Sequence, residues 1–247
     1  MTATSITPDV AETIASADQP VVVVTGASSG IGAEIAVDLS ADRVVIAVGR
    51  DERRLDEVVA RGREGAIIPV QLDLADLESI ESALTELPRV DAVVHAAALL
   101  HHTTAETTPD VWRRMLEVNV IAPAELTRVL LPALRDARGT IVLIGSGASR
   151  RAAANHIVYA ATKHALQAYA DGIRAELEPD GVRVSTVSPG PTATRGALGA
   201  EDQPLDEAAA RIRIAPETVA RSVRHVLDAP ADAQLTEVWV RPRTELR

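Results

Sequence analysis

The chain has 247 residues, of which 47% are hydrophobic, and a formal net charge of −10. This length and composition exclude a disordered chain and allow one sizeable core, while the negative charge argues against nucleic acid or an anionic membrane as a partner. The absence of cysteine excludes disulfides and thiolate metal sites, and no apolar run is long enough to span a bilayer.

Short Val- and Ile-rich runs alternate with longer amphipathic segments along the chain. The runs predict strands at 21–25, 43–48, 66–72, 91–96, 140–145, 183–188 and 236–241. The intervening segments predict helices at 31–40, 51–61, 76–87, 109–136, 156–178 and 216–228, with Pro123 and Pro132 interrupting the fourth helix. Strands that are apolar on both faces are typical of parallel sheets covered by helices. The alternation therefore predicts an α/β fold, a doubly wound Rossmann-like domain with a seven-stranded parallel sheet and helices on both faces.

Residues 20–247 contain no linker, repeat or low-complexity block, so we expect a single domain. Residues 1–19 are polar and acidic and lack the basic start and apolar centre of a signal peptide. We expect them to form a loosely ordered extension, and we expect the protein to be cytoplasmic.

The first predicted strand runs into the glycine-rich stretch TGASSGIG, which contains Gly26, Gly30 and Gly32. Glycines permit a tight turn and close approach of phosphates, and the following helix offers free N–H groups and a positive dipole end. The alternative is an ordinary strand-to-helix turn. At the first junction of a doubly wound sheet, this stretch favours a dinucleotide site.

The end of the second strand distinguishes the two nicotinamide dinucleotides. An NAD site has an acidic residue there for the ribose hydroxyl, whereas an NADP site has an arginine for the 2′-phosphate. This chain has Arg50 at that position, and Asp51 and Glu52 come after it. We therefore favour NADP(H) over NAD(H), the alternative being that Arg50 belongs to a solvated helix face.

Lys163 is the only lysine in the chain, and it follows Tyr159 by four residues on a predicted helix. The two side chains therefore share a helix face. A nearby ammonium stabilises a phenolate and lowers the tyrosine pKa towards neutral pH. The pair indicates an activated tyrosine that acts as a general acid or base, although chance spacing is the alternative.

Two further polar residues lie near the same edge of the predicted sheet. Ser146 follows the fifth strand, where it is either a catalytic hydroxyl or a cap residue. Asn119 lies inside a helical segment four residues before Pro123. Because proline lacks an N–H group, the carbonyl of Asn119 loses its helical partner and becomes able to hold a water molecule. The alternative for Asn119 is a buried structural amide.

Together these features resemble the short-chain dehydrogenase/reductase family over about residues 20–241. The stretch TGASSGIG matches the TGxxxGxG cofactor motif of the family, and SPGPTAT at 188–194 matches its PG motif. Asn119, Ser146, Tyr159 and Lys163 match the catalytic tetrad in order. The resemblance implies an oxidoreductase that acts on CH–OH and C=O groups.

The resemblance also implies the role of each site residue. Tyr159 donates a proton to the carbonyl oxygen or removes it in the reverse direction, Ser146 positions that oxygen, and Lys163 lowers the Tyr159 pKa and binds the nicotinamide ribose. Asn119 holds a water molecule that relays protons to Lys163. The implied cofactor contacts are Gly26, Ser28, Ser29, Gly30, Ile31, Gly32, Arg50, Asp73, Leu74, Ala96, Ala97, Tyr159, Lys163, Pro189, Gly190 and Thr192.

The chain departs from the family after the fourth strand, where HAAA (95–98) replaces the usual NAAG. His95 thus replaces an asparagine that ties neighbouring strands together, and we expect it to make an equivalent structural hydrogen bond. No third ligand near His101 and His102 points to a metal, so we expect no metal site.

The segment at about 192–215 is expected to form a short, polar substrate lid, which indicates a small alcohol, ketone or aldehyde. The leading hypothesis is therefore an NADP(H)-dependent oxidoreductase. The alternative is a catalytically silent NADP(H)-binding sensor or interaction protein on the same fold. The resemblance implies a homotetramer or a homodimer, formed through the helical segments at 109–136 and 156–178.

Overall fold

Seven parallel strands form the centre of the structure, a computed structural model that describes residues 6–194 and 212–244. Their order across the sheet is β3-β2-β1-β4-β5-β6-β7. The strands are β1 (Val21–Thr25), β2 (Val44–Gly49), β3 (Ile67–Gln71), β4 (Ala92–His95), β5 (Thr140–Ile144), β6 (Arg183–Pro189) and β7 (Glu237–Val240). The predicted doubly wound α/β fold is confirmed, and the order of the strands reverses between β1 and β4.

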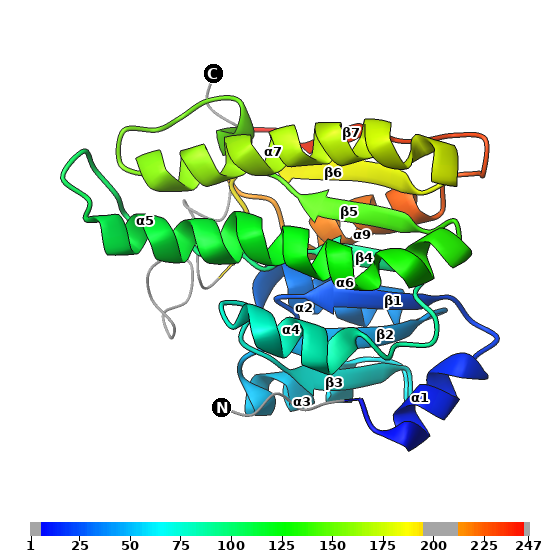
Figure 1. Ribbon diagram of the computed structural model, residues 1–247. Coiled ribbons are helices and arrows are strands. Elements are labelled where there is room, and N and C mark those ends of the chain that lie inside the picture. The colour runs from blue at the N-terminus through cyan, green and yellow to red at the C-terminus, as the bar shows by residue number, and fades with distance from the viewer. Residues whose placement is uncertain (1–5, 195–211, 245–247) are drawn as a thin grey trace.

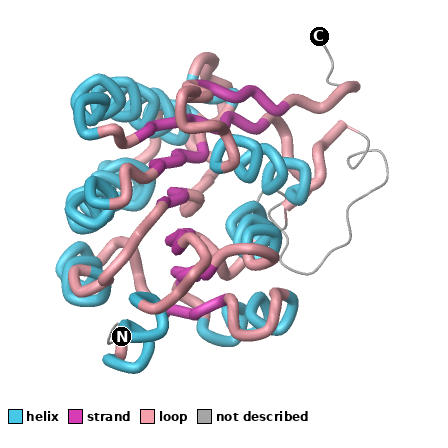
Figure 2. The backbone as a smooth tube through the Cα atoms, turned by 90° about the vertical axis from the view of Figure 1, so that its right-hand side faces the viewer, coloured by secondary structure: helices cyan, strands magenta, loops and turns pink. Residues whose placement is uncertain are grey.

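Helices cover both faces of this sheet. Figure 1 shows α4 (Leu77–Leu84), α6 (Ala122–Asp136) and α7 (Ile157–Leu177) in front of the strands. The opposite face carries α2 (Gly30–Leu39), α3 (Glu52–Arg61) and α9 (Pro216–Leu227). Figure 2 shows the strands between the two helical layers. Within the described ranges, no helix is long and apolar enough to cross a membrane.

Successive residues of each strand enter two different hydrophobic cores, because side chains alternate across a sheet. In β1, Val21 and Val23 pack in the core that contains residues of α4, α6 and α7. Val22 and Val24 pack in the core that contains residues of α2, α3 and α9. All five residues of β1 are buried, so an uninterrupted apolar run is what this central strand requires.

The long helix expected at 109–136 is divided in the structure. Helix α5 (Pro109–Leu116) passes into a π-helical turn, η1 (Glu117–Ile121), and then into α6. Pro132, by contrast, lies inside α6 without ending it, which corrects the expected interruption there. Pro132 is exposed, so water can hydrate the carbonyl that its missing N–H leaves without a helical donor.

The segment before β1 contains a helix that packs against the domain. Within the described part of this segment, Pro8–Ala15 form helix α1, which lies at the amino-terminal edge of the sheet (Figure 1). Ile14 has 0% of its surface exposed and belongs to the same core as α6 and α7. Arg89 Nη1 donates a 2.9 Å hydrogen bond to the Ala17 carbonyl. Burial of an apolar face therefore holds this segment against the domain.

Ile14→Ala is expected to lower the free energy of unfolding by about 2–5 kcal/mol, because it removes a fully buried side chain from a packed core. Urea unfolding followed by circular dichroism measures this loss. The control is Glu12→Ala, which changes an exposed side chain on the same helix and is expected to change stability by less than about 0.5 kcal/mol. Unaltered stability of Ile14→Ala would contradict a docked α1.

Candidate active site

The glycine-rich turn after β1 forms one wall of a cavity of about 490 Å³ at the carboxyl ends of the strands. We call it the glycine-turn cavity. Every cofactor residue predicted from the first four strands lines it: Gly26, Ser28, Ser29, Gly30, Ile31, Gly32, Arg50, Asp73, Leu74, Ala96 and Ala97. The structure therefore brings these residues together at the point where the strand order reverses, which is where ligands bind in open α/β sheets.

Glycine is required at two positions of this turn. Gly26 has φ of +66°, and a Cβ atom there would lie 2.8 Å from Ala97 Cα. A Cβ atom on Gly32 would lie 2.3 Å from the Gly26 carbonyl oxygen. Helix α2 begins at Gly30, so its free N–H groups and the positive end of its dipole lie at the turn. This cradle of backbone atoms fits the pyrophosphate of a dinucleotide.

Thr25 fastens the turn to the end of the neighbouring strand β4. Its side chain is 1% exposed. The Thr25 hydroxyl accepts hydrogen bonds from the N–H groups of Ala96, at 3.1 Å, and Ala97, at 3.2 Å. Both residues follow the end of β4 at His95, and the Ala96 N–H also donates a 3.1 Å hydrogen bond to the Val94 carbonyl. The hydroxyl thereby sets the distance between two walls of the glycine-turn cavity.

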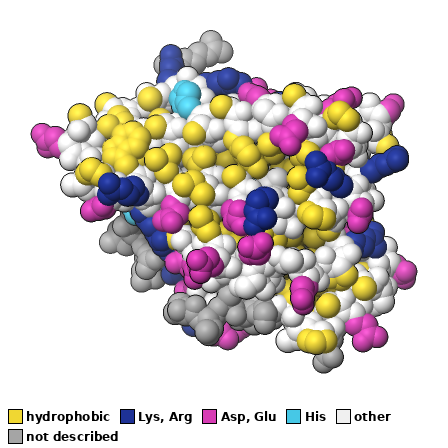
Figure 3. Space-filling view, in the orientation of Figure 1, with side chains coloured by type: hydrophobic (Ala, Val, Ile, Leu, Met, Phe, Trp, Pro, Cys, Tyr) yellow, Lys and Arg dark blue, Asp and Glu magenta, His cyan; other side chains and the backbone are white. Residues whose placement is uncertain are grey.

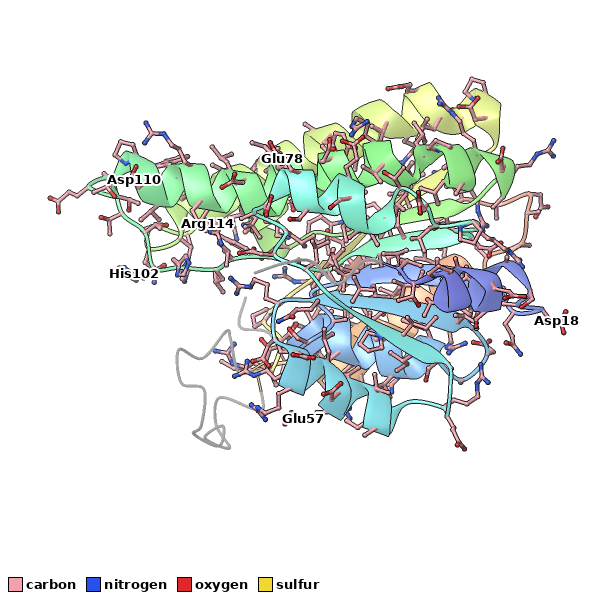
Figure 4. The ribbon with its side chains drawn as sticks, turned by 60° about the horizontal axis from the view of Figure 1, so that its bottom comes forward. Asp18, Glu57, Glu78, His102, Asp110 and Arg114 are labelled. Carbon is pink, nitrogen blue, oxygen red and sulfur yellow. The ribbon has the colours of Figure 1, made fainter. Side chains whose placement is uncertain are left out.

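Two charged residues, Arg50 and Asp73, line the glycine-turn cavity. Asp51 follows Arg50 in the chain but is not among the lining residues. Arg50 is exposed directly after β2. The Asp51 carboxylate instead caps α3, where it accepts a 3.0 Å hydrogen bond from the Arg54 N–H. Asp73 pairs with Arg114 at 3.3 Å, and Figure 4 shows Arg114 on α5. The cation at the end of β2 therefore lines the cavity, while the next carboxylate has a structural role.

A second cavity of about 790 Å³ adjoins the first, and we call it the serine–tyrosine cavity. Ile31, Ala96 and Thr194 are among the residues that line both cavities. The remaining predicted site residues from the later strands line the second one: Ser146, Tyr159, Lys163, Pro189, Gly190 and Thr192. A ligand that extends from the glycine turn along the shared wall would thus reach the tyrosine and the serine.

Ser146 is held by the short 3-10 turn that follows β5, η2 (Gly147–Ser149). The Ser146 hydroxyl accepts a 3.1 Å hydrogen bond from the Ala148 N–H. In return, the Ser149 hydroxyl accepts a 3.2 Å bond from the Ser146 N–H, which completes a reciprocal cap. The Ser146 side chain also hydrogen-bonds the Tyr159 phenol. Ser146 is thus both a cap residue and a member of the site.

Burial shifts the pKa values of Tyr159 and Lys163 in opposite directions. Burial raises the pKa of the Tyr159 phenol, while its hydrogen bond with Ser146 acts to lower that pKa. Burial lowers the pKa of Lys163 to about 8. Lys163 Nζ lies 5.7 Å from the Tyr159 ring centre and donates a 2.7 Å hydrogen bond to the Ile144 carbonyl. Burial therefore outweighs the hydrogen bond with Ser146, and the pKa of Tyr159 is raised overall.

Asn119 lies in the π-helical turn η1 and is 1% exposed. Its side-chain oxygen accepts a 2.7 Å bond from the Leu99 N–H, and its amide donates 3.0 Å bonds to the Leu99 carbonyl and the Thr162 hydroxyl. The Thr162 hydroxyl donates to the Tyr159 carbonyl at 2.8 Å. The Asn119 side chain thus joins the loop after β4 to α7. The predicted local departure from α-helical geometry takes the form of the π turn, a feature frequent at functional sites.

His95 makes a hydrogen bond between the sheet and a helix rather than between two strands. It is 2% exposed, and its Nε2 lies 3.0 Å from the Thr127 hydroxyl on α6. Its Nδ1 has no hydrogen-bond partner within the described ranges. Burial lowers the pKa of His95 to about 3, so the ring is neutral at pH 7. The side chain has a structural contact, as expected, but with a different partner.

Other residues of the second cavity were not anticipated from the sequence. Among them are Arg150, Arg151, Trp239 and Arg241. Arg241 directly follows β7, so the rule that ligands bind at strand carboxyl ends could have found it. Thr194 and Arg213 also line the cavity, and both lie within the expected lid. Most of the expected lid at about 192–215 lies outside the described residues.

Comparisons with known proteins match this architecture. A family model described as short chain dehydrogenase matches residues 20–204. An uncharacterised oxidoreductase of Staphylococcus saprophyticus is 32% identical over 235 residues, which cover 90% of this chain and 97% of that protein. An alcohol dehydrogenase of Thermococcus sibiricus, complexed with 5-hydroxy-NADP, has a TM-score of 0.83 at 26% identity and covers 92% of this chain and 98% of its own. A serine dehydrogenase complexed with NADP+ has a TM-score of 0.82 at 27% identity, covering 92% and 96%.

The buried neutral His95 makes stability depend on pH. Its folded pKa of about 3 lies below the ordinary value of 6.5, so the unfolded chain takes up the proton first as the pH falls. The contribution of the neutral His95 ring to the free energy of unfolding is complete above pH 6.5. It is lost as the pH falls towards 3, by about 1.4 kcal/mol for each pH unit. His95→Asn is expected to remove this loss. Urea unfolding at pH 7 and pH 5 compares the two proteins, and identical pH slopes would contradict the prediction.

Proposed function

Because the chain belongs to the short-chain dehydrogenase family, we propose that this oxidoreductase uses NADP(H) to interconvert a small alcohol and its carbonyl compound. The single observation that carries the proposal is the meeting of Ser146, Tyr159 and Lys163 in one cavity. That cavity shares a wall with the glycine-turn cavity. A dinucleotide site thus opens directly onto a buried acid–base group.

The residues of the two cavities fit a nicotinamide dinucleotide. The turn from Gly26 to Gly32 would hold its pyrophosphate, and Asp73 and Leu74 would lie at its adenine end. Ala96 and Ala97 would line its middle, while Pro189, Gly190 and Thr192 would hold its nicotinamide end. When bound, the cofactor supplies or accepts a hydride.

Tyr159 is proposed to act as the general acid in carbonyl reduction and as the general base in alcohol oxidation. Burial raises its pKa, so the phenol carries its proton at neutral pH and can donate it to the carbonyl oxygen. The Ser146 hydroxyl, already hydrogen-bonded to the phenol, would also hold that oxygen. The opposite charge of Lys163 would stabilise the phenolate left behind.

Lys163 and Asn119 are proposed to restore the proton to Tyr159. Lys163 has a pKa of about 8, which allows its ammonium to lose and regain a proton near neutral pH. The backbone carbonyl of Asn119 would hold a water molecule that leads from Lys163 towards solvent. The Asn119 side chain is occupied by Leu99 and Thr162, so its role is to position this carbonyl.

The preference for NADP(H) is supported by the different positions of Arg50 and Asp51. Arg50 lines the glycine-turn cavity, where its guanidinium would pair with a 2′-phosphate. The Asp51 carboxylate caps α3 and lies 3.4 Å from Arg54, so it is not placed for a ribose hydroxyl. The two structural relatives described above were solved with NADP-type ligands, which also supports this choice.

We further propose a homodimer or homotetramer that assembles through α5, α6 and α7. Figure 3 shows hydrophobic side chains gathered across the face that these helices form in Figure 1. Ile121, between α5 and α6, is 47% exposed. Apolar surface of this kind on a soluble domain supports contact with another chain.

Tyr159→Phe is expected to lower the rate of carbonyl reduction by about 100-fold or more, since it removes the acid while leaving the ring in place. Loss of absorbance by NADPH with a panel of small ketones and aldehydes measures this rate. The control is Tyr169→Phe, which removes the only other tyrosine hydroxyl, on the same helix; it is expected to retain activity.

Two outcomes would overturn the proposal. Undiminished turnover by Tyr159→Phe would remove Tyr159 from the mechanism. Saturable NADPH binding by the wild type, without turnover of any compound in the panel, would favour a silent cofactor-binding protein.

Arg50→Gln is expected to lower kcat/KM for NADPH by about 10- to 100-fold, the value of one charged hydrogen-bonding partner, and to leave kcat/KM for NADH unchanged. The control is Arg53→Gln, because Arg53 pairs with Glu57 on the exposed face of α3. Equal losses with both cofactors, or a wild type that prefers NADH, would contradict the role of Arg50.

A further inference from the structure

The described wall of the serine–tyrosine cavity is strongly cationic. Besides Lys163, the arginines Arg150, Arg151, Arg213 and Arg241 line it, and no aspartate or glutamate is among its described lining residues. The chain as a whole has a net charge of −10, so the charge of the cavity wall is opposite in sign to the net charge of the protein. A cleft lined by one sign of charge raises the local concentration of ligands of the opposite sign.

Arg241 brings one of these cations next to Ser146. A Cβ atom built on Gly147 would lie 2.5 Å from Arg241 Nη1, and one built on Gly190 would lie 3.4 Å from Arg241 Nε. The guanidinium therefore occupies the space beside two glycines that directly follow Ser146 and Pro189. The Gly190 N–H donates a 2.7 Å bond to the Val240 carbonyl, which fixes the backbone from which Arg241 extends.

Arg213 supplies a second donor on the other side of the PG motif. Its Nε is buried and has no hydrogen-bond partner within the described ranges. Neighbouring backbone bonds hold it in place, since the Ile214 N–H donates to Pro191 and the Ala193 N–H donates to Ile214, both at 2.9 Å. A buried guanidinium donor without an acceptor costs free energy, and an anionic ligand would remove that cost.

The other cations of the wall have different partners or positions. Arg150 pairs with Glu237 at 3.3 Å, so its charge is matched within the chain. Arg151 is exposed. Arg50 lines only the glycine-turn cavity, where the proposed 2′-phosphate lies. Arg213 and Arg241 are the cations that lie beside the PG motif, and Arg241 also lies beside Gly147, the residue after Ser146.

We infer that the substrate carries an anionic group, a carboxylate or a phosphate, which Arg213 and Arg241 hold while its carbonyl or alcohol carbon faces Ser146 and Tyr159. The inference rests on the proposed function for the reacting group. Trp239 and Leu100, which are 40% and 37% exposed, line the same cavity and offer apolar surface to the carbon chain. Small oxo acids, hydroxy acids and their phosphate counterparts have this combination of groups.

The test uses Trp239 as a reporter. The chain has two tryptophans, so Trp112→Phe leaves Trp239 as the single source of tryptophan emission. Pyruvate, acetoacetate and levulinate are titrated against their methyl esters, and dihydroxyacetone phosphate against dihydroxyacetone. Parallel titrations of free tryptophan correct for absorption by the ligands. At least one anion is expected to bind at least about tenfold more tightly than its neutral counterpart. Tighter binding in the carboxylate series or in the phosphate series shows which anionic group the site prefers.

Two substitutions assign this preference to residues. Arg213→Gln and Arg241→Gln are each expected to raise the Kd of the preferred anion by about tenfold or more and to leave the Kd of its neutral counterpart unchanged. Arg221→Gln is the control, because Arg221 is exposed on α9 and outside the cavity. Thermal unfolding of each variant verifies that it folds, and Arg213→Met and Arg241→Met, which also remove the charge, replace a variant that does not.

The outcomes separate this inference from the proposed function. The inference is overturned if no anion binds more tightly than its neutral counterpart, or if both arginine variants keep the preference. Turnover with NADPH, measured on the same compounds, tests the proposed function independently. Selective anion binding without turnover supports the anion site and counts against the oxidoreductase reaction. Turnover of neutral compounds alone supports the oxidoreductase reaction and counts against the anion site.

Discussion

The hydroxyl of Thr25 accepts two backbone hydrogen bonds from the end of β4, and the rest of the site depends on this junction. It holds Ala97 close to Gly26, which gives the glycine-turn cavity its two facing walls. Beyond Ala97, Leu99 bonds to the Asn119 side chain, Asn119 bonds to Thr162, and Thr162 bonds to the carbonyl of Tyr159. A line of polar contacts thus runs from the end of β1 to helix α7. The distance between the dinucleotide turn and the tyrosine is set by short hydrogen bonds rather than by loops.

Burial has opposite effects on the charges of the site and of the frame behind it. It raises the pKa of Tyr159 and lowers the pKa of Lys163. Burial therefore favours the neutral form of each side chain. It also keeps His95 neutral. The wall of the serine–tyrosine cavity also carries arginines, whose guanidinium groups remain charged in any protein environment. The site therefore combines proton donors whose charge is adjustable with cations whose charge is permanent.

The sequence predicted the strands closely because a buried parallel strand needs an unbroken apolar run, as in Val21–Thr25. It also predicted the residues of the glycine turn and the Tyr159–Lys163 pair, because local spacing determines how these groups share a turn or a helix face. Other features depend on contacts between distant segments. No periodic signal in the sequence marks these contacts. They include the packing of Ile14 against the main core, the partner of His95 on α6, and the convergence of Arg213 and Arg241.

The contact between Gly147 and Arg241 links two positions that are far apart in the chain. A side chain at position 147 would occupy the space of the guanidinium, so any residue larger than glycine there would displace the end of Arg241. The cofactor turn lies on β1 and α2, outside this pair. Substitutions at the carboxyl ends of β5 and β7 can therefore reshape the serine–tyrosine cavity while the glycine-turn cavity stays intact. The contact between Gly147 and Arg241 thus belongs to the half of the molecule that can change without disturbing the glycine-rich turn.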